Sequence, residues 1–291
     1  MAKPIRNMGA SVRARLLAIS KERNQPFELV LTRYVLERLL YRLTQTKHRE
    51  RFVLKGAMLI TTWFDDPHRP TRDVDLLGFG DPNPEAMIAI FREIAGVAID
   101  DGVEFDATSV RTEQIREDLE YGGLRIRIDA TVSGARIGAV IDIGFGDAVE
   151  PGLEEAEIPS LLDQPPPRLR SYARETVIAE KFHAMVLFGR ANSRLKDYYD
   201  IWVLSQAFKF DGDRLSRAIA ATFERRKTPI PTDIPDALTP DFAQDAAKQQ
   251  HWNALLRDAA AKPGSLEVVV AALERFLIPH ANRARVLGKS E

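Results

Sequence analysis

Two aspartates separated by one residue, Asp73 and Asp75, have the type and spacing that most directly suggest chemistry in this sequence. Residues 73–77 are predicted to form a short strand, and side chains two residues apart on a strand point to the same face. Neighbouring carboxylates repel each other unless a cation lies between them, and carboxylate oxygens suit Mg²⁺. The spacing therefore predicts a magnesium site, although Asp211 and Asp213 have the same spacing where we expect a turn and a helix cap.

A lysine and a glycine upstream of these aspartates could bind phosphate. Lys55, Gly56 and Ala57 begin a segment, residues 55–64, that is predicted to be a short buried helix. Free N–H groups at a helix N-terminus attract anions, glycine lets a ligand approach the backbone closely, and Lys55 adds a full positive charge. The alternative is an ordinary helix start with a solvated lysine.

A third carboxylate, Asp142, interrupts an otherwise apolar segment, residues 137–143. Its neighbours Ile141 and Ile143 would face the opposite side of a strand, so Asp142 is expected to project into mostly apolar surroundings. An ionised carboxylate there needs a partner, which makes Asp142 a candidate site residue. A salt bridge or exposure at the end of the strand is the alternative, whereas Asp147 is expected to lie in a turn.

Charged residues gather again in the C-terminal half of the chain. Lys181 lies at the edge of an apolar helical pattern, and Asp197 and Asp200 share one face of the next predicted helix. Lys196 lies four residues before Asp200 and can reach it. A routine charged helix surface is the alternative. His183 is not expected to bind a metal, because the few histidines are scattered and no His-x-x-x-His pair exists.

The elements that must position these residues begin with helices and continue with strands. The first fifty residues and residues 84–97 follow helical spacing. Residues 122–143 alternate with period two around Ser133 and Gly134, which predicts a hairpin. The strands are not separated by regular crossover helices, so we expect a mixed sheet backed by helices.

Residues 163–167, Asp-Gln-Pro-Pro-Pro, form the clearest linker of the chain. Nearly everything beyond this linker is expected to be helical, in the segments 174–188, 195–207, 212–226, 241–261 and 265–278. The predicted fold class is therefore α+β. A mixed-sheet domain, residues 1–162, is followed by a helical domain, residues 163–291.

Composition excludes several classes of protein. The 291 residues include 41 Lys and Arg and 42 Asp and Glu, so the net charge is −1 and a nucleic-acid partner would need a local basic patch. The sequence has no cysteine, which excludes a disulfide partner, a thiolate metal site and a cysteine nucleophile. No run of about 18 apolar residues and no signal peptide are found, so we expect a cytoplasmic location with no membrane partner.

Five segments in this order resemble the AbiEii/AbiGii toxins, nucleotidyltransferase-like proteins of the DNA polymerase β superfamily. The segments are residues 55–57, 69–76, 140–147, 180–184 and 194–200. The resemblance spans roughly residues 27–207. It implies a mixed-sheet nucleotidyltransferase domain and a helical domain, with the active site in the cleft between them.

The resemblance implies a role for each candidate residue. Asp73 and Asp75 would bind the Mg²⁺ that also holds the triphosphate of an NTP substrate, and Asp142 would complete a second metal site or activate the attacking hydroxyl. Lys181 would complement charge in the transition state, and Asp200 matches the functional aspartate of the family. Lys55 would act on the phosphates during catalysis. The residues expected to bind the nucleotide are Lys55, Gly56, Ala57, Arg69, Thr71, Arg72, Lys196 and Asp197.

The chain departs from the wider superfamily at Ala57, where a serine usually follows the glycine. The hydroxyl contact to the triphosphate is therefore absent, and the backbone N–H groups and Lys55 remain. This departure affects the expected nucleotide contacts and leaves the expected metal site unchanged.

The same resemblance implies transfer of a nucleotide to the 3′ end of tRNA, which would block aminoacylation and translation, and a separately encoded antitoxin as partner. Basic residues that could meet an acceptor stem, or simply form solvated faces, are Arg168, Arg170, Arg174, Arg190, Arg194, Lys196, Arg225, Arg226 and Lys227. Two alternatives stay open. The chain could be a nucleotidyltransferase acting on a protein or a small molecule, or a non-catalytic nucleotide-binding module.

Overall fold

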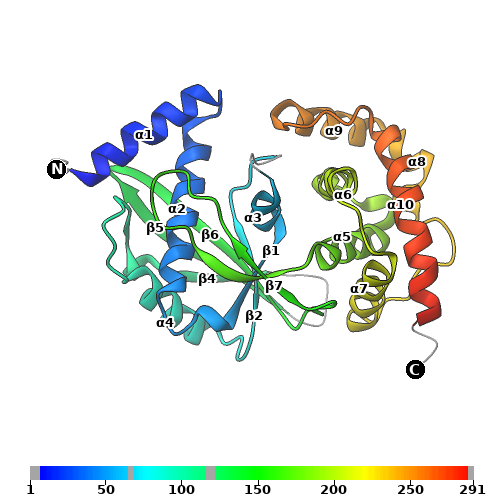
Figure 1. Cartoon of the computed structure of the whole chain (residues 1–291), viewed down its shortest axis with the longest axis horizontal. Coiled ribbons are helices and arrows are strands. Elements are labelled where there is room, and N and C mark those ends of the chain that lie inside the picture. Colours follow the sequence, from blue (N-terminus) through cyan, green and yellow to red (C-terminus); the bar gives the residue numbers. More distant parts are fainter. Residues whose placement is uncertain (1–6, 65–68, 116–121, 288–291) are drawn as a thin grey trace. The chain divides into compact units, whose positions relative to one another are not determined.

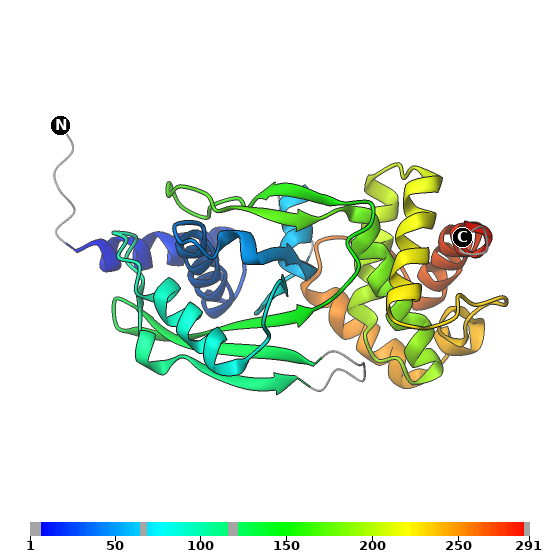
Figure 2. The ribbon, with the colours of Figure 1, turned by 90° about the horizontal axis from the view of Figure 1, so that it is seen from below.

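The computed structural model describes residues 7–64, 69–115 and 122–287, which form two compact units (Figures 1 and 2). The first unit comprises Met1–Asp65, Thr71–Gly146 and Glu155–Ser171. The second unit comprises Asp66–Pro70, Asp147–Glu154 and Tyr172–Glu291. The last division along the chain lies between Ser171 and Tyr172, whereas the sequence predicts a boundary at residue 162, and a strand that follows the proline linker still pairs with the sheet of the first unit.

An eight-stranded mixed sheet forms the centre of the first unit in the described part of the chain. Its strands are β1 (Phe52–Lys55), β2 (Val74–Gly78), β3 (Glu104–Phe105), β4 (Arg111–Ile115), β5 (Gly123–Val132), β6 (Ala135–Phe145), β7 (Leu153–Glu157) and β8 (Arg168–Tyr172). They lie in the order β3-β5-β6-β2-β1-β8-β7, and β4 also pairs with β5. The pairs β2–β6 and β1–β8 are parallel, whereas β1–β2 and β5–β6 are antiparallel, so the predicted α+β fold with a mixed sheet is confirmed.

The predicted hairpin is the pair β5–β6, and its turn fixes the register of the central strands. Ser133 and Gly134 both have positive φ, 47° and 79°, the backbone that a two-residue hairpin turn requires. Alternation then buries one face, where Ile126 lies opposite Ile141. The opposite face of the hairpin carries charged side chains.

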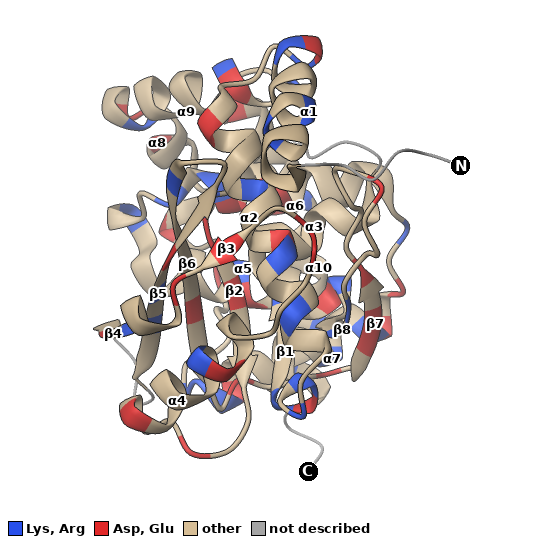
Figure 3. Ribbon diagram, turned by 90° about the vertical axis from the view of Figure 1, so that its left-hand side faces the viewer, with Lys and Arg blue, Asp and Glu red and all other residues tan. Residues whose placement is uncertain are grey.

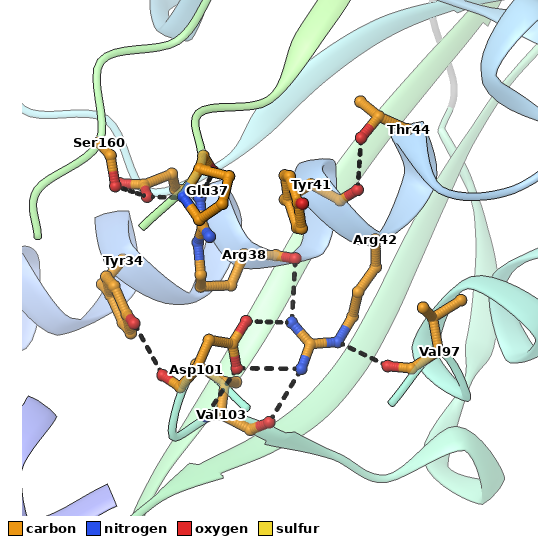
Figure 4. Close-up of polar contacts among 11 residues, drawn as sticks. Tyr34, Glu37, Arg38, Tyr41, Arg42, Thr44, Val97, Asp101, Val103 and Ser160 are labelled. Carbon is orange, nitrogen blue, oxygen red and sulfur yellow. Dashed lines mark hydrogen bonds and ion pairs between the residues drawn. The ribbon is translucent and has the colours of Figure 1, made fainter. Parts of the chain in front are cut away.

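Four helices of the first unit are α1 (Met8–Glu22), α2 (Phe27–Thr44), α3 (Gly56–Ile60) and α4 (Pro84–Ala95). Helix α2 packs on β6 and α4 packs on β4. A buried ion pair ties α2 to the loop before β3, because both carboxylate oxygens of Asp101 accept from the Arg42 guanidinium, at 2.6 and 3.0 Å (Figure 4). The same guanidinium donates to the carbonyls of Val97 and Val103, so this buried charge is well satisfied.

The second unit is helical. Its helices are α5 (Arg174–Phe188), α6 (Leu195–Ala207), α7 (Gly212–Arg225), α8 (Pro240–Ala243), α9 (Ala246–Asp258) and α10 (Leu266–Leu287). The bounds predicted for α5 and α6 are confirmed, and Asp211 caps α7 as expected. The single helix predicted over residues 241–261 is wrong, because Asp245 begins a new helix with its own side-chain cap.

Helix α10 continues beyond the residue at which we expected it to end. Pro279 removes one backbone donor, yet the helix runs on because Leu277 and Ala281 on either side of the proline are buried. In the part of the chain that the structure describes, no helix has both the length and the apolar character needed to cross a membrane.

Candidate active site

Five charged residues form one row across five neighbouring strands of the sheet, and we call them the charged row. Lys55 on β1 lies opposite Asp75 on β2, and Asp75 lies opposite Asp142 on β6. Asp142 in turn lies opposite Arg125 on β5, which lies opposite Glu113 on β4. Residues directly opposite each other on neighbouring strands point to the same face of a sheet. The register therefore brings the predicted residues Lys55, Asp75 and Asp142 together.

Asp73 lies immediately before the charged row's second strand, because β2 begins at Val74, one residue later than predicted. The Thr71 hydroxyl donates to Oδ1 of Asp73 at 2.8 Å and so orients this carboxylate. Asp73 is only partly buried, whereas Val74 is buried completely. Thr71 thus has a contact consistent with its predicted place at the site, and Arg72 between them is exposed.

Gly56 is required by its position against Asp75. It has a φ of +68°, and a Cβ added to it would lie 1.9 Å from Oδ2 of Asp75. Any larger residue would displace the Asp75 carboxylate. Lys55 is the last residue of β1 and Gly56 and Ala57 begin α3, so the helix predicted over residues 55–64 is shorter than expected and a strand precedes it.

Asp142 has the salt bridge that the sequence left open as an alternative. Nε and Nη2 of Arg125 donate to Oδ1 and Oδ2 of Asp142, both at 2.7 Å. The Asp142 side chain is 19% exposed and the Arg125 side chain is 34% exposed. The hydrogen-bonded Asp142 carboxylate holds the pKa of Arg125 above its ordinary value, and the charge of Asp73 adds to this effect.

Arg125 is a site residue that was not predicted, although the sequence contains a signal for it. With a two-residue turn, Val132 pairs with Ala135. Counting seven residues back along β5 and seven forward along β6 then pairs Arg125 with Asp142. The predicted hairpin therefore already contained the partner of Asp142.

The donor chemistry of this site fits a magnesium ion held by two carboxylates. Mg²⁺ is commonly bound through one or two carboxylates together with substrate phosphates, and Asp73 and Asp75 are of that kind. Within residues 7–64, 69–115 and 122–287, no three Asp, Glu or His side chains are gathered closely enough to hold a metal. Asp142 is bound to Arg125, so the predicted set of three carboxylates is not assembled.

A second group of charges, which we call the ionic network, lies within the second unit. Nζ of Lys181 donates to Oδ1 of Asp197 at 2.7 Å and lies 2.9 Å from Oδ2 of Asp200. Arg69 donates through Nε and Nη2 to both oxygens of Asp200, each at 2.7 Å. Arg194 donates from Nε to Oδ2 of Asp197, also at 2.7 Å.

Burial and pairing together set the protonation states of Lys181 and Asp200. Burial lowers the pKa of Lys181, but the carboxylates of Asp197 and Asp200 outweigh burial and hold this pKa above its ordinary value. Burial raises the pKa of Asp200, but Lys181 and Arg69 outweigh burial and lower it to about 2. Lys181 and Asp200 are therefore both charged at neutral pH.

The ionic network differs from what the sequence indicated. The alternative interpretation, a routine charged helix surface, is wrong for Asp197 and Asp200, because their side chains are only 4% and 3% exposed. Lys181 and Arg69 bind Asp200, whereas Lys196 is exposed. Arg69, expected at a phosphate, is 9% exposed and donates two short hydrogen bonds to Asp200.

The arginines considered for an acceptor stem mostly have acidic partners. Arg168 binds Glu157 at 2.5 Å, and Arg190 binds Asp241 at 3.0 Å. Arg226 lies 3.0 Å from Asp147 and 3.2 Å from Glu180. Segments with basic residues and segments with acidic residues are mixed over the ribbon (Figure 3). These arginines do not by themselves indicate a nucleic-acid surface.

Comparison with known proteins agrees with the resemblance in sequence. The family model described as "Nucleotidyl transferase AbiEii toxin, Type IV TA system" matches residues 38–275, which include every candidate site residue. No curated protein matches the chain. A candidate nucleotidyltransferase from H. pylori is 14% identical, with a TM-score of 0.49 over 86% of this chain and 93% of its own. JHP933 from Helicobacter pylori is also 14% identical, with a TM-score of 0.46 over 87% of this chain and 91% of its own.

A match over this much of the chain assigns the family. The family also assigns the general chemistry, which is transfer of a nucleotidyl group from an NTP. The chain is therefore an NTP-dependent nucleotidyltransferase and belongs to the AbiEii nucleotidyl transferase toxin family of type IV toxin–antitoxin systems.

Proposed function

We propose that this toxin uses the charged row, with Mg²⁺, to transfer a nucleotide from an NTP to the 3′ end of tRNA and thereby blocks translation. The observation that carries the proposal is the placement of Asp75. Asp75 lies opposite Lys55 and Asp142 on the neighbouring strands. Its carboxylate packs directly against Gly56, and only a glycine, which has no Cβ, fits at that position. A carboxylate pair beside a lysine and a glycine is suited to holding a cation and a polyphosphate.

Asp73 and Asp75 would hold the Mg²⁺, and Asp142, which is paired with Arg125 in this structure, would serve as the third carboxylate only when that pair opens. When bound, the ion would neutralise the triphosphate and stabilise the charge that develops on the leaving pyrophosphate. Thr71 holds the Asp73 carboxylate in one orientation through its hydrogen bond. The fixed geometry of the ligands would lower the cost of arranging them during the reaction.

Lys55 and the backbone of Gly56 and Ala57 would bind the phosphates of the nucleotide. The exposed Arg72 is placed next to Asp73 in the sequence and would add a further positive charge. Ala57 offers no hydroxyl, so phosphate binding would depend on charge and on backbone N–H groups.

The ionic network would contribute through Lys181, Asp197 and Asp200, and the exposed Lys196 would add a contact to the nucleotide. The ion pairs of the network hold the Lys181 ammonium in one place. Lys181 would in this way complement negative charge in the transition state. Arg69, which we expected at a phosphate, is proposed instead to fix the orientation of Asp200.

Membership of a type IV toxin–antitoxin family implies a separately encoded antitoxin as partner. The acceptor and the nucleotide can be identified in one experiment. The purified protein is incubated with Mg²⁺ and each of the four α-labelled NTPs, together with total tRNA or with cell protein. Label on tRNA that is lost with Asp73→Asn supports the proposal. Label only on protein, or no label on either acceptor, would contradict the tRNA assignment.

A further inference from the structure

Arg125 occupies both oxygens of Asp142, which makes it the immediate competitor of any cation at this carboxylate. The two bonds are equal at 2.7 Å, and the residues lie opposite each other on β5 and β6. Glu113, the neighbour of Arg125 on β4, accepts hydrogen bonds from Arg127 at 2.8 and 3.3 Å. The Arg125 guanidinium therefore pairs with Asp142 and not with Glu113.

The ion pair between Arg125 and Asp142 can open, so that Asp142 can exchange Arg125 for another cation. The Arg125 side chain is 34% exposed, so its guanidinium can leave Asp142 and remain hydrated. A buried pair such as Arg42 and Asp101, which are 2% and 0% exposed, has no such alternative. The difference in exposure separates a pair that can open from a pair that only holds the fold together.

We propose that Arg125 is the counter-ion that a divalent cation must displace from Asp142, so that Arg125 sets the metal affinity of the charged row. This inference rests on the proposed function, because it takes Asp73 and Asp75 as the other ligands. With Arg125 on Asp142, an approaching cation meets a carboxylate that is already neutralised. Without Arg125, the cation meets a third carboxylate with both oxygens available, directly opposite Asp75.

The test is a titration of the nucleotide-free protein with Mn²⁺ alone, which replaces Mg²⁺ at carboxylate sites and can be followed by the electron paramagnetic resonance of the unbound ion. Arg125→Gln is expected to bind Mn²⁺ about tenfold more tightly than the native protein, the effect of losing one charge-assisted pair. Arg127→Gln is the matched control, because Arg127 lies two residues along the same strand and also pairs with a carboxylate. Its affinity should stay within about twofold of the native value.

Two further variants separate competition from a general structural effect. Arg125→Gln combined with Asp142→Asn should lose the gain and return to about the native affinity, because the carboxylate that Arg125 masks is then absent. Arg125→Lys keeps the charge without the two-pronged geometry and should lie between the native protein and Arg125→Gln. Circular dichroism of each variant establishes that it is folded before titration.

An affinity of Arg125→Gln equal to or weaker than that of the native protein, including no binding by either, overturns the inference. A gain that persists in the double variant overturns it as well, since Asp142 would then not be the masked ligand. Failure of the proposed function has a different signature. In that case, the native protein would put no label on tRNA, or Asp73→Asn would keep that label, whatever the Mn²⁺ titrations give.

Discussion

The charged row and the ionic network use the same ingredients, paired aspartates with lysine and arginine partners, in two different environments. In the row, Asp142 and Arg125 are 19% and 34% exposed, whereas Lys181 and Asp200 in the network are 10% and 3% exposed. A partly exposed ion pair can exchange its partner at little cost, but a buried pair cannot. The comparison indicates that the row is built to take up ligands and that the network is built to hold one arrangement.

Asp73→Asn should produce the largest effect and should act on activity alone. Removing one charge from a metal ligand is expected to lower nucleotidyl transfer by about 1,000-fold. The Asp73 side chain is partly exposed, so the free energy of unfolding should change by less than about 1 kcal/mol. Transfer assays and urea denaturation measure the two quantities. Near-native transfer by this variant would remove Asp73 from the metal site.

Lys181→Ala should act on stability as well, in contrast to Asp73→Asn. It leaves Asp197 and Asp200 buried without their shared cation, which is expected to cost about 3–5 kcal/mol of unfolding free energy. Lys196→Ala is the control, since Lys196 is exposed on the same helix as both aspartates and should change stability by less than about 0.5 kcal/mol. Equal stability of the two variants would show that burial does not distinguish the network from a surface.

Gly56→Ala tests the close packing inside the charged row. The added Cβ would overlap with the Asp75 carboxylate, and the positive φ is unfavourable for alanine. We expect transfer to fall about 100-fold, because the carboxylate must move, and stability to fall by about 1–2 kcal/mol. Gly138→Ala on β6 provides the comparison, because a Cβ there meets no atom within 4 Å. A fully active Gly56→Ala would mean that the position of Asp75 is not critical.

The pH dependence of stability should show the smallest effect and should arise from the network. The pKa of Asp200 is lowered to about 2 from 3.8, chiefly because Lys181 and Arg69 outweigh its burial. Its contribution, about 2 kcal/mol, is therefore fully present above pH 3.8 and is lost as the pH falls toward 2. The stability difference between the native protein and Asp200→Asn should narrow by this amount between pH 5 and pH 2 in denaturant titrations. A constant difference would contradict the assignment.

Local patterns in the sequence predicted much of the fold. The bounds of α5 and α6 and the hairpin turn at Ser133 and Gly134 follow from periodicity and turn chemistry, and the structure confirms them. The strand β1 was missed because it is only four residues long and runs directly into α3. The mixed sheet itself was expected, but its strand order was not, since parallel pairing joins segments far apart in the sequence.

The candidate site, like the fold, has parts that local sequence patterns predict and parts that they do not. The register places Lys55, Asp75 and Asp142 in one row, and Arg125 could have been found by counting from the predicted turn. The bond from Arg69 to Asp200 joins residues 131 positions apart, and no local pattern predicts it. The burial of Asp197 and Asp200 could not be predicted either. Helical spacing shows that two residues share a face of a helix, but it does not show what covers that face. The catalytic roles themselves stay predictions.

Replacing Asp75 by asparagine tests the central claim most directly, since the two side chains have nearly the same shape. Transfer of label from an NTP to tRNA and the free energy of unfolding should be measured on the same preparation. We predict that Asp75→Asn loses transfer by about 1,000-fold and keeps native stability within about 1 kcal/mol, because the charge serves a ligand and not the fold. Transfer at the native rate, or a loss of activity that only follows unfolding, would contradict the assignment of the charged row as the active site.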